Sequence, residues 1–436
     1  MRKKKIQLNR QWLFSLLAGL MLMLVFVRYA LQINYPRAIL LGLSAIMSFI
    51  GNPSQILALC MFSIPLTTAY HYVYAIFIAI IVYILKYERR IRFNVTIIPI
   101  FLLIIWELLH GIGGEFALKD LVRMFLPYLL CGLLRWQDEQ SVKNLDYAYI
   151  VRAYAISTCA VCIILIFGVI KTVNYDLSKA FVGIQRLGKV EENSQQIGII
   201  VNPNSLGIMC VMAASGLLQL ITTGRRKKQD IYLLVVLLIS GMLTVSRTYL
   251  ALLLIMVLLF GFAARHSFGE RMRFLIIIVI ITGLVIGLAY WIFPGVFDAF
   301  SDRFDVDDLS SGRMTLFLKY NDYLLSRPEI MMFGIGLTNF PVRISLMTNF
   351  FNVPHNGIQE IILAWGIIGL AIFLAFCACF LIKEKKIWGR KTLINYIPFI
   401  LWFAKIQAGQ MVTSDYTMLL LAYCCLSVTY DFADKN

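Results

Sequence analysis

Charged residues are scarce in this sequence of 436 residues, where only 15% are charged and 60% are hydrophobic. A soluble globular protein carries about a quarter charged residues, so the composition excludes an ordinary soluble domain. Apolar runs recur from one end of the chain to the other, for example at residues 231–245 and 274–292. Such runs are typical of transmembrane helices. They are continuous rather than alternating, which indicates helical spans instead of strands.

Residues that bind metals or form disulfides are few or unsuitably placed. The sequence has only four histidines, and all nine cysteines lie within apolar runs. Cys159 and Cys162 have the spacing of a CxxC pair, but on a membrane-embedded helix this spacing favours small buried side chains over a redox or zinc pair. The cysteines therefore indicate neither a redox pair nor a zinc site, and no metal or cofactor site is visible in the sequence.

The apolar runs predict an all-α polytopic membrane protein of about 12–14 transmembrane helices with one large extracytoplasmic loop. The whole chain, residues 1–436, is expected to form a single integral membrane domain, because the sequence shows no internal repeat and no separate soluble segment. The predicted spans are residues 12–33, 37–51, 54–68, 70–86, 95–112, 117–135, 148–170, 197–222, 231–246, 248–264, 274–293, 355–382, 392–409 and 413–430.

The net charge of +16 is distributed over short segments between the spans. If the N-terminus is cytoplasmic, the short inner segments hold more than half of the lysines and arginines, and the long outer loops 171–195 and 294–354 hold few. Because positive residues mark the cytoplasmic side, the pattern predicts cytoplasmic N- and C-termini and argues against nucleic-acid binding. The basic start of the chain precedes an apolar run without a small-residue cleavage site, so we expect a retained first span.

Several charged side chains are predicted at membrane depth, where such groups usually pair or serve a function. Snorkelling of long side chains to the interface explains Lys119, Arg152 and Lys405. Arg247 differs, because it joins two apolar runs with almost no loop between them. A guanidinium at such an outer junction can bind a phosphate or carboxylate through two bonds, and an interfacial anchor is the alternative explanation.

The outer loop 294–354 is the predicted catalytic loop. Ser310 or Ser311 is a candidate N-cap, which places Arg313 in the first turn of a helix. A helix N-terminus carries free N–H groups and positive potential, so Arg313 can form part of an anion site, with a solvated surface arginine as the alternative. The acidic residues Asp305, Asp307 and Asp308 are expected to be solvated.

Two features follow Arg313 within and just after this loop. Gly334 and Gly336 permit a close backbone approach, but a lone GxG is no nucleotide motif. His355 follows Pro354 and is predicted at the N-terminus of the next helix, where the helix dipole lowers the pKa of the imidazole. A neutral imidazole can act as a general base near neutral pH, and a hydrogen-bonded interfacial histidine is the alternative.

Five short motifs occur in order around this loop. They are Asn202-Pro-Asn-Ser-Leu-Gly207, Ser246-Arg-Thr248, Ser311-Gly-Arg313, Gly334-Ile-Gly336 and His355-Asn356, the last followed by Trp365-Gly-Ile-Ile-Gly369. The order resembles that of the O-antigen polymerase and O-antigen ligase superfamily of membrane glycosyltransferases. The resemblance covers about residues 197–380 by motif and the whole chain by hydropathy.

The resemblance implies a metal-independent, inverting transfer of a glycan from a polyprenyl diphosphate to an acceptor sugar, on the outer face of a bacterial cell membrane. Arg247 and Arg313 would bind the diphosphate, and His355 would deprotonate the attacking hydroxyl. Ligases and polymerases share this pattern, but no second outer-loop motif marks the chain as a ligase acting on a lipid A core. We therefore favour a polymerase that links repeat units into a capsule, O-antigen or exopolysaccharide, in the bilayer and with other polysaccharide-assembly proteins as candidate partners. Further candidates for substrate binding are Asn202, Asn204, Asn356 and Arg327.

Other functions are compatible with these features. A ligase that transfers a finished glycan to a terminal acceptor shares the same motifs. A flippase of lipid-linked oligosaccharides has a similar number of spans, but it predicts two related halves and no catalytic loop. A purely structural scaffold would leave the motifs without a purpose. The glycosyltransferase hypothesis predicts that Arg247, Arg313 and His355 converge on one outward-facing cavity.

Overall fold

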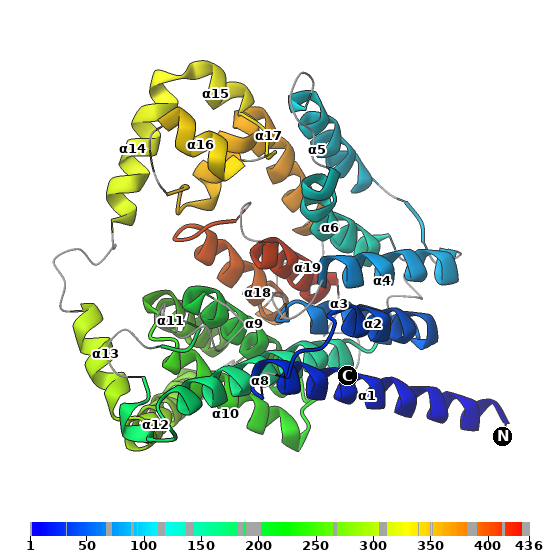
Figure 1. Cartoon of the computed structure of the whole chain (residues 1–436), viewed down its shortest axis with the longest axis vertical. Helices are drawn as coiled ribbons and strands as arrows, with labels where there is room; N and C mark the ends of the chain where they lie inside the picture. Colours follow the sequence, from blue (N-terminus) through cyan, green and yellow to red (C-terminus); the bar gives the residue numbers. More distant parts are fainter. Residues whose placement is uncertain are drawn as a thin grey trace.

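The computed structural model shows a bundle of helices (Figure 1). It describes residues 2–31, 33–66, 72–88, 91–93, 95–111, 118–136, 144–181, 186–188, 202–264, 268–304, 312–338, 340–348, 350, 352–381, 390–411 and 415–429. Within these ranges the regular structure is helical and contains no strand, which confirms the predicted all-α class.

Each predicted span coincides with a helix. These helices are α1 (Arg2–Tyr29), α2 (Ala38–Ile50), α3 (Pro53–Ser63), α4 (Tyr72–Tyr87), α5 (Ile97–His110), α6 (Leu118–Arg135), α8 (Tyr147–Thr172), α9 (Pro203–Thr222), α10 (Lys228–Leu243), α11 (Arg247–Ala264), α12 (Phe268–Ile292), α17 (Gly357–Leu381), α18 (Arg390–Ile406) and α19 (Asp415–Thr429). The predicted outer loop carries four more helices, α13 (Gly295–Phe304), α14 (Arg313–Ser326), α15 (Pro328–Phe333) and α16 (Phe340–Thr348). A short 3-10 turn spans Leu177–Lys179.

The helices have the length, composition and exposed surface of membrane spans. Among the described residues, α1, α8, α9 and α17 are long and apolar enough to cross a membrane, and eight shorter apolar helices accompany them. Large apolar side chains such as Leu254 and Leu284 are exposed on the outside of the bundle. Exposed apolar side chains on helices are expected where the surrounding solvent is lipid. The chain is therefore a multi-pass membrane protein.

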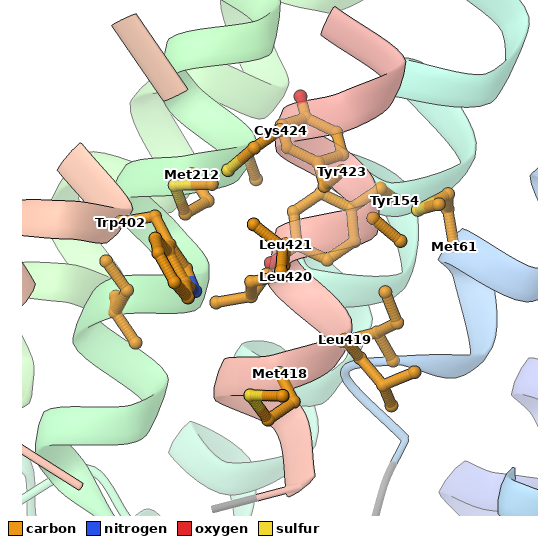
Figure 2. Close-up of a cluster of buried hydrophobic side chains, with 14 of the residues drawn as sticks. Met61, Tyr154, Met212, Trp402, Met418, Leu419, Leu420, Leu421, Tyr423 and Cys424 are labelled. Atoms are coloured by element: carbon orange, nitrogen blue, oxygen red, sulfur yellow. The ribbon is translucent and has the colours of Figure 1, made fainter. Parts of the chain in front are cut away.

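Helix α19 forms the centre of the bundle, between α6, α9 and α18 (Figure 1). Its side chains are buried from Thr417 to Thr429, as expected for a helix that is apolar all round. Figure 2 shows Tyr423 beside Tyr154 of α8, with ring centroids 4.9 Å apart. On the other side, the indole N–H of Trp402 in α18 donates to the carbonyl of Thr417 at 2.7 Å. Packing on all sides fixes where α19 begins, and that end lies in the candidate site.

The cysteines follow the sequence prediction. All nine are free, and Cys159 and Cys162 are both buried in α8. The Sγ atom of Cys162 lies 3.7 Å from that of Cys210 in α9, without a disulfide. These residues act as small side chains at a helix contact.

Arg152 of α8 does not snorkel, contrary to the sequence prediction. It is buried, and its Nε and Nη2 atoms donate to the two carboxylate oxygens of Asp230 at 2.7 and 2.9 Å. Asp230 also accepts from the backbone N–H of Lys227, which caps the start of α10. The sequence could not show this pair, because its two members are far apart along the chain. Pairing and hydrogen bonding offset the cost of removing both charges from water.

Helix α17 is kinked at Gly366, whose φ of 70° is left-handed. The kink receives the end of α15. The backbone N–H groups of residues 335 and 336 donate to the carbonyls of Leu363 and Ala364 at 2.9 and 2.7 Å. A Cβ atom on Gly334 would lie 2.4 Å from the Ala364 oxygen, and Gly336 also has a positive φ. The predicted close backbone approach is confirmed, and it joins the outer-loop helices to α17.

Helix α5 closes this junction from the other side. The buried carboxylate of Glu107 accepts from the backbone N–H of Leu337 at 2.9 Å and from the indole N–H of Trp365 at 2.8 Å. The Nε2 atom of His110 lies 2.7 Å from the carbonyl of Phe333. These two ionisable groups therefore hold α5 against α15 and α17, which gives them a structural role at membrane depth.

The kink gives a direct test of this junction. A Gly366→Ala substitution places a Cβ 2.1 Å from the Met332 carbonyl oxygen at a backbone conformation that L residues rarely adopt. We expect it to prevent folding or to destabilise the protein by more than about 2 kcal/mol. The matched control is Gly42→Ala in α2, where a Cβ meets nothing within 4 Å. Thermal unfolding in detergent measures both, and equal midpoints would contradict the close packing.

Candidate active site

Arg313 is the first residue of α14, so it lies in the first turn of a helix as predicted. The capping position is Gly312, which has a φ of 76° and provides no side-chain cap, so the predicted serine cap is not at this position. Ser310, Ser311 and the acidic residues Asp305, Asp307 and Asp308 lie outside the described residues. The Nη1 atom of Arg313 donates to the carbonyl of Ala408 at 2.9 Å, in the connection between α18 and α19.

His355 lies two residues before α17, so it precedes the helix instead of opening it. Asn356 is the capping residue. Its Oδ1 atom accepts from the backbone N–H groups of Ile358 and Gln359 at 3.0 and 3.1 Å, and its Nδ2 atom donates to the carbonyl of Gln407 at 3.1 Å. An asparagine cap therefore fixes the start of α17 and also attaches it to the α18–α19 connection.

Side-chain hydrogen bonds hold α14 against the start of α17. The amide nitrogen of Gln359 donates to the carbonyl of Phe317 and to Oδ1 of Asn321 at 2.8 and 2.7 Å. The hydroxyl of Tyr320 donates to the carbonyl of Asn352 at 2.8 Å. Two consecutive turns of α14 are thus fixed to one short segment, and this brings Arg313 to the same end of the bundle as His355.

The electrostatic surroundings of His355 confirm that proximity. Burial lowers the pKa of His355 below its ordinary value of 6.5, and the positive charges of Arg313 and Lys405 lower it further. The direction agrees with the sequence prediction, but the cause differs. Burial and two cations, rather than the helix dipole, keep the imidazole neutral.

Lys405 is a member of the site that the sequence assigned to the membrane interface. It is only 5% exposed, so it does not snorkel to water. Its ammonium donates to the carbonyl of Gln410 and to the hydroxyl of Thr417, and it lies 5.4 Å from the ring centroid of Tyr416. Its position at the end of an apolar run suggested an interfacial side chain. Its partners instead come from the α18–α19 connection and from α19.

The Asn-Pro-Asn-Ser motif forms the neighbouring part of the site. Asn202 caps α9 through its Oδ1 atom, which accepts from the backbone N–H of Asn204 at 2.9 Å. The Oδ1 atom of Asn204 accepts from the hydroxyl of Ser246 at 2.8 Å. The hydroxyl of Ser205 donates to that of Tyr416 at 2.5 Å. The motif thus connects the start of α9 to the α10–α11 corner and to the start of α19.

Arg247 opens α11 directly after this corner. The chain turns at Val245, whose φ of 47° is rare for a β-branched residue and marks local strain. Gly207 of α9 leaves room for the corner, because a Cβ there would lie 3.0 Å from the Cβ of Tyr249. The sequence Asn202–Gly207 therefore fixes the position of Arg247 through both hydrogen bonds and close packing.

The structure divides the predicted site residues into three sets. Arg313, His355 and Asn356 lie together around the α18–α19 connection, and Lys405 joins them. The second set, Arg247, Asn202 and Asn204, is joined to the first through Ser205, Tyr416 and Lys405. Arg327 alone is the third.

Arg327 is not part of either set. It follows α14 at the end opposite Arg313, about 20 Å away along the helix at 1.5 Å per residue. It is exposed, and its nearest carboxylate is that of Glu329 at 3.7 Å. Its distance from Arg313 could not be predicted, because the sequence did not show how long α14 is.

Residues 232–374 match the model of the O-antigen ligase family. This segment is similar to the O-antigen ligase and polymerase superfamily. The match confirms the resemblance seen in the motifs, and it includes Arg247, Arg313 and His355. Lys405 and Tyr416 lie beyond it. Members of the family are membrane glycosyltransferase-like enzymes that act on lipid-linked glycans. Comparison with curated proteins gives no match.

The charged side chains at the described site are those of Arg247, Arg313, Lys405 and Glu360, the last buried in the first turn of α17. In the part of the chain that the structure describes, no group of three His, Cys, Asp or Glu side chains is placed to hold a metal ion. A cationic site next to a neutral imidazole can bind an anionic leaving group and accept a proton.

The His355 pKa can be tested without a substrate. Reaction with diethyl pyrocarbonate requires a neutral imidazole, so the pH dependence of His355 labelling, followed by mass spectrometry, reports its pKa. We expect a midpoint below 6.5 in the wild type. Arg313→Gln removes a neighbouring cation, which raises the midpoint. Lys319→Gln removes an exposed cation further along α14 and is the matched control. An unchanged midpoint in Arg313→Gln would contradict the proximity of the two side chains.

Proposed function

We propose that this protein polymerises oligosaccharide repeat units carried on a polyprenyl diphosphate, and that Arg313 and His355 are the centre of its active site. The observation that carries the proposal is the convergence of α14, the start of α17 and the α18–α19 connection. This convergence places an arginine beside a histidine whose pKa is lowered by burial and by the charges of Arg313 and Lys405.

The proposed reaction is a direct displacement at the anomeric carbon of the donor. A hydroxyl oxygen of the acceptor sugar forms the new glycosidic bond, while the bond between the anomeric carbon and the phosphate oxygen breaks. His355 accepts the hydroxyl proton, which requires the neutral imidazole. The bonding electrons leave with the polyprenyl diphosphate, and the configuration of the anomeric carbon inverts.

The arginines are assigned to the leaving group. Negative charge grows on the diphosphate as the glycosidic bond to the donor breaks, and a fixed guanidinium stabilises that charge. Arg313 occupies a position set by α14 and by the carbonyl of Ala408. Arg247 is proposed to contact the diphosphate from the strained α10–α11 corner. Both side chains belong to helix starts, which present positive potential.

The site is proposed to face the outside of a bacterial cytoplasmic membrane, with residues 294–354 as the catalytic loop. The starts of α9, α11, α17 and α19 meet the end of α18 there. At the other end of the bundle, Lys86 of α4 donates to the carbonyl of Gly51 after α2, and Ser54 of α3 accepts from the backbone N–H of Asp146. Helix ends from successive spans therefore lie at alternate ends of the bundle, as the predicted topology requires. With the site facing outward, this arrangement supports cytoplasmic N- and C-termini.

A ligase remains the second candidate, because the matched family takes its name from O-antigen ligase. The two functions share donor and chemistry, and they differ in the acceptor. A polymerase is favoured, because the sequence shows no second outer-loop motif that marks a ligase acting on a lipid A core. Capsule, O-antigen and exopolysaccharide are the product classes that a polymerase of this type makes.

The proposal is tested with purified protein in detergent and polyprenyl-diphosphate-linked repeat units. The wild type should produce a ladder of longer glycans. We expect His355→Ala to lower the rate by about 10²–10⁴-fold, as for loss of a general base. Arg313→Ala should cost about 10²–10³-fold through loss of charge stabilisation. Lys319→Gln, on the same helix, should retain the wild-type rate.

Each other outcome has a definite meaning. A single transfer to an added acceptor, without a ladder, indicates a ligase. Movement of the lipid-linked glycan across liposomes without new glycosidic bonds indicates a flippase. Full activity in His355→Ala would remove His355 from the mechanism.

A further inference from the structure

The peptide group between Gln410 and Met411 is held by two buried, oppositely charged side chains. Its carbonyl oxygen accepts from the ammonium of Lys405, and its N–H donates to Oε2 of Glu360 at 2.5 Å. Glu360 is fully buried in the first turn of α17, and Lys405 is buried near the end of α18. The two charges are also within electrostatic range of each other.

This arrangement specifies the orientation of the peptide plane. If the plane turned over, the carbonyl oxygen would face the Glu360 carboxylate and the N–H would face the Lys405 ammonium. Both contacts would be repulsive and both charges would lose a hydrogen bond, which is costly for buried groups. The charge pair therefore holds the connection in one of two opposite orientations.

The same connection positions the site. Within residues 407–411, the carbonyl of Gln407 accepts from Asn356, and the carbonyl of Ala408 accepts from Arg313. The backbone N–H of Ala408 donates to the carbonyl of Lys405, which continues the turn from α18. The 410–411 peptide and the two carbonyls that hold Arg313 and Asn356 thus belong to one short connection.

We infer that Glu360 and Lys405 are positioning residues of the proposed active site, which hold residues 407–411 so that Arg313 and the start of α17 meet beside His355. The inference rests on the proposed function for its effect on catalysis. Both side chains are buried and satisfied by the backbone, so they act through the connection and do not touch the reacting atoms. Lys405 lies outside the match to the O-antigen ligase family. Glu360 lies within it but belongs to none of the motifs.

The charged and titratable groups around His355 set the expected pH effects. Arg313 of α14 and Lys405 of α18 act on His355 directly, and Glu360 of α17 and Tyr416 of α19 lie around Lys405. Arg247 opens α11 beyond them. Lys405→Gln removes a cation beside His355, so His355 should protonate at higher pH. Glu360→Gln removes a negative charge from these cationic surroundings, so His355 should protonate at lower pH.

The test measures the His355 midpoint in both variants by diethyl pyrocarbonate labelling, in folded protein judged by size exclusion. Shifts in opposite directions support the inference, because loss of packing alone would move both midpoints the same way. Lys405→Arg retains the cation and should restore the wild-type midpoint. With lipid-linked repeat units, kcat should fall about 10- to 100-fold in both glutamine variants, with little change in the donor KM, as expected for misplacement of groups that act in the transition state.

Other results overturn the inference. Parallel shifts or unshifted midpoints would show that the pair does not set the surroundings of His355. Failure of both variants to fold would do so as well, because glutamine is isosteric with Glu360 and still offers an N–H donor in place of Lys405, so a local role predicts folded proteins. If the wild type transferred no glycan, the proposed function would fail, while the labelling experiment would still decide the role of the pair.

Discussion

The structure depends on satisfying backbone polar groups where helices end at the edge of a membrane. A connection between two spans exposes carbonyl and N–H groups that lipid cannot satisfy. Between α18 and α19, four such groups are satisfied by side chains. Arg313, Asn356 and Glu360 come from elsewhere in the fold, and Lys405 comes from α18 itself. The requirement that closes this connection also brings three helices to one point, so stability and the assembly of the site have the same cause.

Glycine and asparagine serve this assembly in different ways. Gly207 and Gly366 remove side chains where one backbone or side chain must approach another closely. Asn202 and Asn356 cap the starts of α9 and α17. Asn356 directly follows His355, and Asn202 lies two residues before Asn204. Each of these short motifs fixes one helix end, which explains why they are spread along the chain. Their joint role is recognised only in the folded structure, where the helix ends meet.

The sequence predicted the spans well, because an apolar run must become a helix in lipid and little else competes with that outcome. The positions of Arg313 and His355, at one helix start and just before another, could be predicted because they are local features of the sequence. The surroundings of Lys405, Arg152 and Arg327 could not be predicted, since they depend on how the chain packs beyond the run in which each residue lies. Arg152 needs Asp230, Lys405 needs the 407–411 connection, and Arg327 is separated from the site by the length of α14. Local signals cannot report such tertiary contacts.

A base in a cationic site faces opposing requirements. In the proposed reaction, burial and the charges of Arg313 and Lys405 lower the pKa of His355 and so favour the neutral form that accepts a proton, but each cation that lowers the pKa also makes the imidazole a weaker base. The Glu360 carboxylate, buried beside Lys405, is proposed to offset part of that second effect. Lys405 and Glu360 bond the carbonyl and the N–H of one peptide group, whereas Arg313 is assigned to the diphosphate. The proposed site therefore separates two tasks, because Arg313 would bind the leaving group and the buried pair would adjust the base.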